Sequence, residues 1–384
     1  MHPNSATSSR PLHLAIGGLL SLAAAIGIGR FVYTPILPAM IADVPLSQSA
    51  AGIIGSANFI GYLLGAVVAG SVWRPRKLRS ALLLALAASA ATTAAMGLAG
   101  SMAAFILLRG AGGAASAFAL VLSSTLILDQ LHADGRDSLS SVHFAGVGAG
   151  IAASAALISA LHMSSSTWQQ MWLFSGLASF AITGAVAALV PNSPAIVKTP
   201  PAAGTLTSRS RIWPLVLAYG LFGFGYVITA TFLVAMVGNS PGVQAFEPWI
   251  WIAVGLAAIP SVSLWSSLGN RIGILNALGA ACFAEALGVA ASVVWVNVWG
   301  LFLAAALLGG TFMGITALGL IAARRMSASP LRSVSLMTAA FGVGQIVGPA
   351  AAGFGYQLTG SLYLPSLIAA LALCVAALLS LLPR

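Results

Sequence analysis

The chain has 384 residues, of which 59% are hydrophobic and only 6% charged, and its mean hydropathy is +1.00. Ordinary soluble domains carry roughly 25% charged residues, so this composition excludes a water-soluble protein and indicates an integral membrane protein. The net charge of +10 does not indicate a nucleic-acid-binding protein, because the basic residues lie in short clusters between apolar runs and no nucleic-acid-binding motif accompanies them.

Apolar runs long enough to cross a hydrocarbon core of roughly 30 Å recur along the whole chain. In chain order there are twelve such runs, at 12–40, 49–72, 80–99, 102–128, 139–162, 168–190, 213–237, 247–267, 272–295, 298–323, 332–357 and 361–383. Residues 1–11 form a polar tail, and residues 191–212, rich in proline and serine, form a linker. The sequence therefore predicts an all-α integral membrane fold of twelve transmembrane helices in two pseudo-symmetric six-helix bundles, at 12–190 and 213–384.

The basic residues lie in alternate connections between the predicted spans. If the N-terminus is cytoplasmic, fourteen of the sixteen lysines and arginines fall in cytoplasmic segments and none in the opposite loops. Such an asymmetry sets the orientation of membrane proteins, so we expect a multi-pass protein of the cell inner membrane with both termini in the cytoplasm. The first run is too long for the apolar core of a signal peptide, and we expect it to stay as an uncleaved span.

An internal repeat supports the division into two halves. A shift of 196 residues superposes glycines of three predicted helix pairs: Gly27 and Gly29 on Gly223 and Gly225, Gly113 on Gly309, and Gly146 and Gly148 on Gly342 and Gly344. One constant offset that serves three pairs indicates duplicated halves. Parallel repeats of this kind are one architecture of alternating-access transporters.

Two segments carry a resemblance to a known family. With GIGRFVYTPILPAM at 27–40 and SANFIGYLLGA at 56–66, the chain resembles the major facilitator superfamily (MFS), in particular its YbfB/YjiJ branch, over nearly the whole length. The resemblance implies two six-helix bundles, a central cavity lined by spans 1, 4, 7 and 10, and alternating access. The acidic residue usual in the loop between spans 2 and 3 is absent, and Asn270 stands at its counterpart between spans 8 and 9.

Three ionisable residues lie deep in predicted spans, where a buried charge is costly and therefore suggests function. Arg30 and Arg109 lie at similar depth, and two guanidinium groups could together bind one carboxylate. The alternative is that either arginine donates to backbone carbonyls and fixes helix packing. Glu285, near the middle of span 9, could carry a proton or could be a hydrogen-bonded packing residue. Because proline lacks a backbone donor, we also expect Pro35 and Pro38 to bend span 1.

Uncharged polar residues at helical spacing form a second group of substrate-binding candidates. They are Tyr33, Asn58, Tyr62, His143, Tyr226 and Gln345. Each of them could instead be a satisfied polar contact between helices. Tyr226 takes the place of Arg30 in the repeat, so positive charge is concentrated in the N-terminal half.

These features predict a secondary active transporter that moves a small solute, such as an organic anion, by alternating access, with proton coupling implied by the family resemblance. A drug or metabolite efflux antiporter for non-anionic substrates is the main alternative, and a transporter-like receptor or channel is a further one. We expect no enzyme and no catalytic residues, because HExxH and GxSxG motifs are absent. Cys282 and Cys374 lack metal-ligand spacing, so no metal or cofactor is expected. The expected partners are the substrate, protons and the lipid bilayer, with the chain as a monomer.

Overall fold

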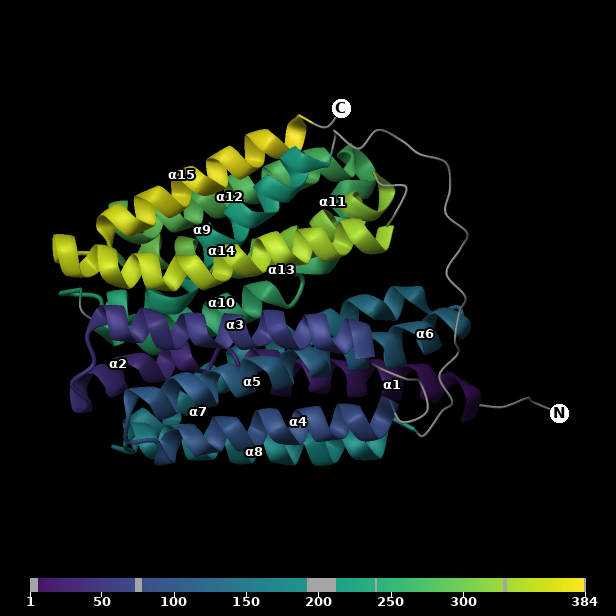
Figure 1. The fold of residues 1–384 in the computed structure, drawn as a ribbon, viewed down its shortest axis with the longest axis horizontal. Coiled ribbons are helices and arrows are strands. Elements are labelled where there is room, and N and C mark those ends of the chain that lie inside the picture. Colours follow the sequence, from purple (N-terminus) through teal and green to yellow (C-terminus); the bar gives the residue numbers. More distant parts are fainter. Residues whose placement is uncertain (1–5, 73–77, 192–211, 239, 327–329, 383–384) are drawn as a thin grey trace. The chain divides into compact units, whose positions relative to one another are not determined.

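The computed structural model describes residues 6–72, 78–191, 212–238, 240–326 and 330–382. Within these ranges the regular structure is entirely helical, which confirms the all-α fold (Figure 1). Residues 1–5 of the expected tail at 1–11 lie outside the described residues. So do residues 192–211 of the expected linker at 191–212.

The helices follow the predicted spans closely. The first half of the chain contains α1 (Ala6–Leu22), the π-helix η1 (Ala23–Ile28), α2 (Tyr33–Asp43), α3 (Gln48–Val72), α4 (Leu78–Ala95), α5 (Met102–Ser123), the π-helix η4 (Ser124–Leu128), α6 (Asp129–Ala133), α7 (Ser140–Met163) and α8 (Trp168–Leu189). The second half contains α9 (Trp213–Gly238), α10 (Glu247–Ala258), α11 (Ser261–Ile272), α12 (Ile274–Val294), α13 (Val298–Arg325), α14 (Pro330–Thr359) and α15 (Tyr363–Leu381).

Among the described residues, eleven helical stretches are long and apolar enough to cross a membrane, and a bent pair makes up to twelve. The bent pair is α10 with α11, which meet at an angle of 44° and together match the predicted span at 247–267. Pro260 lies at this bend, immediately before α11. Its ring removes a backbone donor and clashes with the preceding turn, which favours a bend at this position.

The chain packs into two compact units. Unit 1 comprises Met1–Val32 and Gly61–Thr199, and unit 2 comprises Tyr33–Ile60 and Pro200–Arg384. The predicted bundles at 12–190 and 213–384 remain a prediction, and the units differ from them in one respect. Residues 33–60, here called the 33–60 segment, pack with the C-terminal helices.

In unit 1, α4 packs against α5 and α8, while α1 and η1 pack against α7. Glycine allows the closest approaches. An added Cβ at Gly27 would lie 2.5 Å from the Cα of Gly150, and one at Gly61 would overlap the carbonyl of Gly110 in α5. The Arg79 guanidinium caps the end of α8 by donating to the Val190 and Ala187 carbonyls, both at 2.6 Å.

Unit 2 repeats the same pairing. Helix α9 packs against α14 as α1 and η1 pack against α7, and α12 packs against α13 and α15 as α4 packs against α5 and α8 (Figure 1). Gly223, the repeat equivalent of Gly27, again marks a close approach, because an added Cβ would lie 2.5 Å from the carbonyl of Phe341 in α14. The pairing of helices therefore agrees with the offset of 196 residues found in the sequence.

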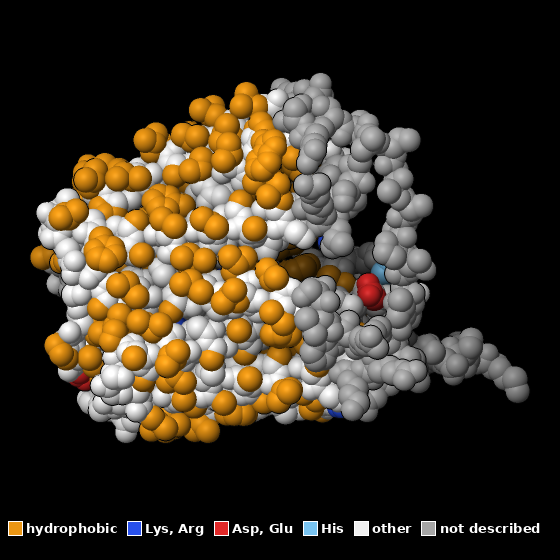
Figure 2. All heavy atoms as spheres, viewed as in Figure 1, with side chains coloured by type: hydrophobic (Ala, Val, Ile, Leu, Met, Phe, Trp, Pro, Cys, Tyr) orange, Lys and Arg blue, Asp and Glu red, His pale blue; other side chains and the backbone are white. Residues whose placement is uncertain are grey.

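Hydrophobic side chains cover most of the visible surface. Figure 2 shows them spread over the face that it draws, while the described acidic and basic side chains lie near its ends. Leu84, Leu107 and Leu371 illustrate this pattern, with exposed fractions of 71%, 71% and 65%. Such a surface suits a lipid environment, in which helices satisfy their own backbone groups and present apolar side chains outward.

Candidate substrate site

The first span is broken near its middle. In η1 the backbone hydrogen bonds widen to the π pattern, with the Gly29 N–H donating to the Ala24 carbonyl at 2.9 Å. A turn at residues 29–32 follows, and α2 begins at Tyr33. The break therefore precedes both Pro35 and Pro38, and a bend of the span at these prolines stays a prediction. Pro35 is in the first turn of α2, where its missing N–H costs no helical hydrogen bond.

Arg30 lies in this break and is buried, with 6% of its surface exposed. Its guanidinium carbon lies 4.2 Å from the centroid of the Tyr62 ring and 5.9 Å from that of Phe31. A cation over an aromatic face is attracted by the ring quadrupole, most strongly when water is excluded. The structure thus brings Arg30 and Tyr62, both predicted from the sequence, into one cluster.

Arg109 of α5 holds the backbone of the break. It is 4% exposed, and its Nη1 and Nη2 donate to the carbonyls of Gly29 and Arg30 at 3.2 and 3.1 Å. Its guanidinium carbon also lies 6.0 Å from the Trp172 ring of α8. Carbonyls at a helix break need such donors, because a buried backbone acceptor without one is costly. This geometry matches the structural alternative for Arg109, and the shared binding of one anion by both arginines remains a prediction.

His143 lies elsewhere in unit 1, fully buried on α7. Its Nε2 lies 3.4 Å from the Ser124 hydroxyl of η4, and its ring contacts Phe144 edge-on. An added Cβ at Gly18 of α1 would lie 2.5 Å from the His143 Nδ1. These contacts give His143 a packing position between α1, α7 and η4.

Tyr226 and Gln345 are brought together in unit 2. The Gln345 amide nitrogen donates to the Tyr226 hydroxyl, and both residues are buried. The Tyr226 ring stacks with Phe312 of α13 at 5.8 Å and with Phe341 of α14 at 5.9 Å. Unit 2 therefore contains an aromatic cluster where the repeat equivalent in unit 1 has an arginine.

Tyr33 and Asn58 lie in the 33–60 segment. The Tyr33 hydroxyl donates to the Ala51 carbonyl at 2.8 Å, which ties α2 to α3, and Asn58 is fully buried on α3. Both residues belong to unit 2 and Arg30 belongs to unit 1, so their expected role in substrate binding stays a prediction.

Two residues that the sequence analysis missed hold the 33–60 segment in unit 2. The Thr34 hydroxyl donates to the Ala230 carbonyl of α9 at 2.7 Å, and the Ser56 hydroxyl donates to the Ile346 carbonyl of α14 at 2.6 Å. Serine and threonine in apolar helices commonly bond to their own helix, so these residue types alone gave no signal. One signal was available, because Thr34 and Ala230 are separated by 196 residues, the offset of the repeat.

Glu285 is fully buried on α12, which packs against α13 and α15. Neither carboxyl oxygen has a hydrogen-bond partner among the described residues. The Thr311 hydroxyl of α13, which donates to the Leu307 carbonyl at 2.6 Å, interacts with the carboxyl group. Within the described part of the chain, no group of three or more His, Cys, Asp or Glu residues could hold a metal ion.

Comparison with known proteins agrees with this architecture. The family described as "Uncharacterised MFS-type transporter YbfB" matches residues 22–381. A point mutant of the nucleoside transporter NupG is 15% identical, with a TM-score of 0.74, and the match covers 97% of this chain and 99% of that chain. A bacterial homologue of the human lysosomal transporter Spinster, in an inward-facing and occupied conformation, is also 15% identical, with a TM-score of 0.69 and coverage of 100% and 97%. No curated protein sequence matches the chain.

Proposed function

Because this chain belongs to the family of YbfB-type MFS transporters, we propose that it carries a small organic anion across the cell inner membrane by secondary active transport. The observation that carries the proposal is the position of Arg30, a buried cation in the broken middle of the first span with its guanidinium against the Tyr62 ring. A break beside a charge gives that part of the helix freedom to rearrange when a ligand binds.

The energetics of a buried charge favour an anionic substrate. Desolvating an arginine side chain costs several kcal/mol even after the protein relaxes. The acidic side chains described in unit 1, Asp129 and Asp134, are exposed at the ends of α6. A substrate carboxylate that enters the site would offset the desolvation cost through charge-assisted hydrogen bonds with the planar guanidinium.

The two arginines then have different tasks. Arg109 fixes the carbonyls of Gly29 and Arg30, so it positions the backbone from which the Arg30 side chain extends. Arg30 recognises the charge of the substrate. In unit 2, the amide of Gln345 and the hydroxyl of Tyr226 stay separate candidates for substrate binding.

Glu285 is the residue that we assign to proton coupling. The Glu285 carboxyl group is fully buried, with the Thr311 hydroxyl as its polar neighbour, and a charge at such a position is costly. It could lose and regain its proton only when the helices around it rearrange. Such a residue can link proton movement to a change of state in the bundle.

The orientation of the chain is part of the proposal. We assign the N- and C-termini to the cytoplasm, because fourteen of the sixteen lysines and arginines lie in the termini or in connections on the same side as the termini. Basic residues are enriched in the cytoplasmic loops of membrane proteins. Fusion of alkaline phosphatase after Ser164, in the loop between α7 and α8, should give an active periplasmic enzyme. Fusion after Arg136, in the connection between α6 and α7 on the cytoplasmic side, should give an inactive enzyme. Activity of the second fusion alone would overturn the orientation.

A thermal-shift screen of the purified protein tests the proposed substrate class. Mono- and dicarboxylates should include compounds that raise the melting temperature, while the matched neutral amides should not. Arg30→Gln should remove the response to the active carboxylates. Equal responses to amides and carboxylates, or a response that survives in Arg30→Gln, would instead support a carrier of non-anionic substrates.

A further inference from the structure

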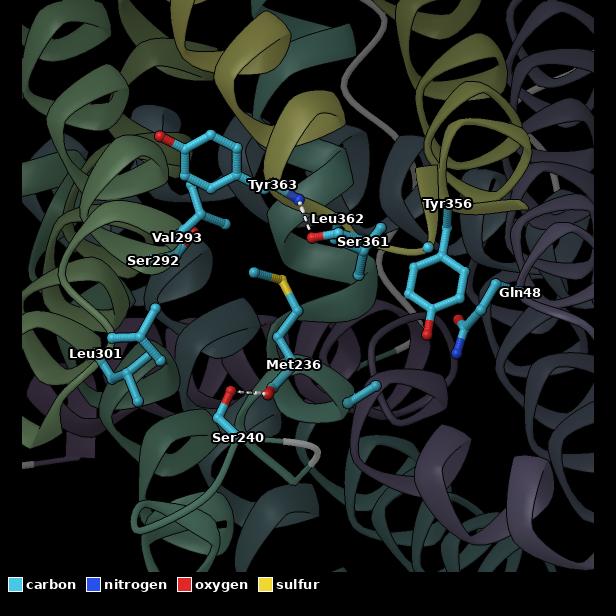
Figure 3. A pocket seen from close by; sticks show the side chains of 13 residues that line it. Gln48, Met236, Ser240, Ser292, Val293, Leu301, Tyr356, Ser361, Leu362 and Tyr363 are labelled. Atoms are coloured by element: carbon cyan, nitrogen blue, oxygen red, sulfur yellow. Dashed lines mark hydrogen bonds between the residues drawn. The ribbon is translucent and has the colours of Figure 1, made fainter. Parts of the chain in front are cut away.

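Unit 2 contains a cavity whose lining does not include Arg30 (Figure 3). Its volume is about 300 Å³, and its walls come from the start of α3, the ends of α9, α12 and α14, and the starts of α13 and α15. Thirteen residues line it, and all of them belong to unit 2. The cavity can therefore be considered apart from the arginine cluster of unit 1.

The lining is polar but carries no charge. Among the thirteen residues are Gln48, Ser240, Ser292 and Tyr356, and none is acidic or basic. Met236 extends toward the middle of the space in Figure 3, and the remaining walls are largely aliphatic. No lining residue carries a charge that could pair with an ionic ligand. A neutral molecule with one polar and one apolar face would match the polar and aliphatic walls.

Several polar atoms of the cavity can accept hydrogen bonds from a ligand. The Ser240 hydroxyl already donates to the Met236 carbonyl at 2.7 Å, and the Ser292 hydroxyl donates to the Val289 carbonyl at 2.7 Å, so both oxygens retain lone pairs for a ligand. The Gln48 Oε1 atom is buried and has no hydrogen-bond partner among the described residues. A buried acceptor without a hydrogen bond lowers the stability of the protein, and a ligand hydroxyl could donate the missing hydrogen bond.

We propose that this cavity binds a small neutral polyhydroxylated ring compound, such as a monosaccharide, at a site distinct from that of the transported anion. The volume is at the lower end of ligand pockets, which restricts the ligand to about one ring. The ring hydroxyls donate to Gln48, Ser240 and Ser292, and an aliphatic face of the ring lies against Met236.

The position of Gln48 links this site to the packing of the 33–60 segment. Gln48 begins α3, and the next residue, Ser49, accepts a hydrogen bond of 2.6 Å from the Gln357 amide of α14. An added Cβ at Gly353 would overlap the Gln48 carbonyl, so α14 and the start of α3 are in close contact. Movement of the 33–60 segment away from α14 would remove Gln48 from the wall. A ligand bound to Gln48 would therefore stabilise the packed state of the 33–60 segment.

Calorimetric titration of the full chain with methyl β-D-glucopyranoside tests this proposal. The protein is held in lipid nanodiscs, because detergents with sugar headgroups would compete for the cavity. Saturable binding is expected, and methyl β-D-glucuronide, which has the same ring but carries a free carboxylate, should bind at least tenfold more weakly. Absence of saturable glucoside binding, or equal binding of both compounds, would overturn the proposal.

Matched variants locate the binding. Gln48→Leu keeps the side-chain bulk and removes the acceptor, so it should weaken glucoside binding about tenfold, the effect of one hydrogen bond. Tyr363→Phe is the control, because its hydroxyl points away from the cavity in Figure 3, and it should bind like the parent. Ser240→Ala supplies a second test if Gln48→Leu does not fold. Unchanged glucoside binding in the folded Gln48→Leu and Ser240→Ala variants would contradict the assignment of the ligand to this cavity.

Arg30→Gln should leave glucoside binding intact, which separates this site from the anion site.

Discussion

The guanidinium of Arg109 donates a hydrogen bond of 3.1 Å to the backbone carbonyl of Arg30, so one intramembrane arginine holds the other in place. Both side chains are buried, and Arg30 lies over the ring of Tyr62. The roles of the two residues can therefore be separated by experiment, with a loss of stability expected for Arg109 variants and a loss of binding for Arg30 variants.

Arg109→Gln should lower the free energy of unfolding by about 2 to 4 kcal/mol, because two charge-assisted hydrogen bonds to the Gly29 and Arg30 carbonyls are lost. Thermal unfolding without ligand measures this. Arg109→Lys should restore part of the loss, since one ammonium group can reach one carbonyl but cannot reproduce the planar fork. An Arg109→Gln protein that melts like the parent would show that the break in the first span does not depend on these bonds.

Tyr62 should contribute to anion affinity through the face of its ring. Tyr62→Phe keeps the aromatic face beneath Arg30 and should retain most of the affinity for a carboxylate identified in the screen. Tyr62→Leu removes the face and should weaken binding by about 0.5 to 2 kcal/mol. Titration of both variants with the same carboxylate measures the difference. Equal carboxylate affinities of the Tyr62→Phe and Tyr62→Leu variants would indicate that the contact of the Arg30 guanidinium with the Tyr62 ring, at 4.2 Å, has no part in binding.

Glu285→Gln should separate transport from proton coupling. The glutamine is neutral and nearly the same shape as a protonated glutamate, so folding and exchange of substrate across the membrane should persist. Accumulation driven by a pH gradient should be lost, because no proton can be released from residue 285. Uptake into proteoliposomes with and without an imposed gradient distinguishes the two processes. Gradient-driven accumulation equal to that of the parent would remove Glu285 from the coupling mechanism.

The packing of α3 against α5 should tolerate no side chain at Gly61. An added Cβ there would overlap the Gly110 carbonyl, so Gly61→Leu should cost at least about 1 to 3 kcal/mol of stability or prevent folding. Gly184→Leu in α8 is the matched control, because a Cβ at this position would meet no described atom within 4 Å. The two variants are compared by melting temperature and yield of folded protein. Similar behaviour of both would contradict the close approach of α3 and α5.

Hydropathy and glycine spacing predicted much of the fold. Twelve apolar runs follow from the bilayer thickness alone, and the glycine repeat matched Gly27 with Gly223, which both lie at close helix contacts. Even the bend of the eighth span had a local signal in Pro260, which lacks a backbone donor. These features depend on neighbouring residues in the chain, which is why sequence patterns reveal them.

Other features depend on contacts between distant residues. The break at Gly29 is stabilised by Arg109 from another helix, a contact that the prolines after the break did not indicate. The packing of the 33–60 segment in unit 2 depends on single hydroxyl groups such as that of Thr34, and hydropathy does not show which neighbour a helix end will contact. The cavity between Gln48 and Tyr356 likewise joins residues with no shared pattern in the sequence.

Solute counterflow in proteoliposomes tests the central claim most directly. With a carboxylate selected by the thermal-shift screen, the parent protein should show saturable exchange that unlabelled carboxylate competes with and the matched amide does not. Arg30→Gln, inserted at the same level, should exchange at the background rate. Exchange by Arg30→Gln at the parental rate, or flux that rises without saturation in the parent, would contradict a carrier that recognises its anion through Arg30.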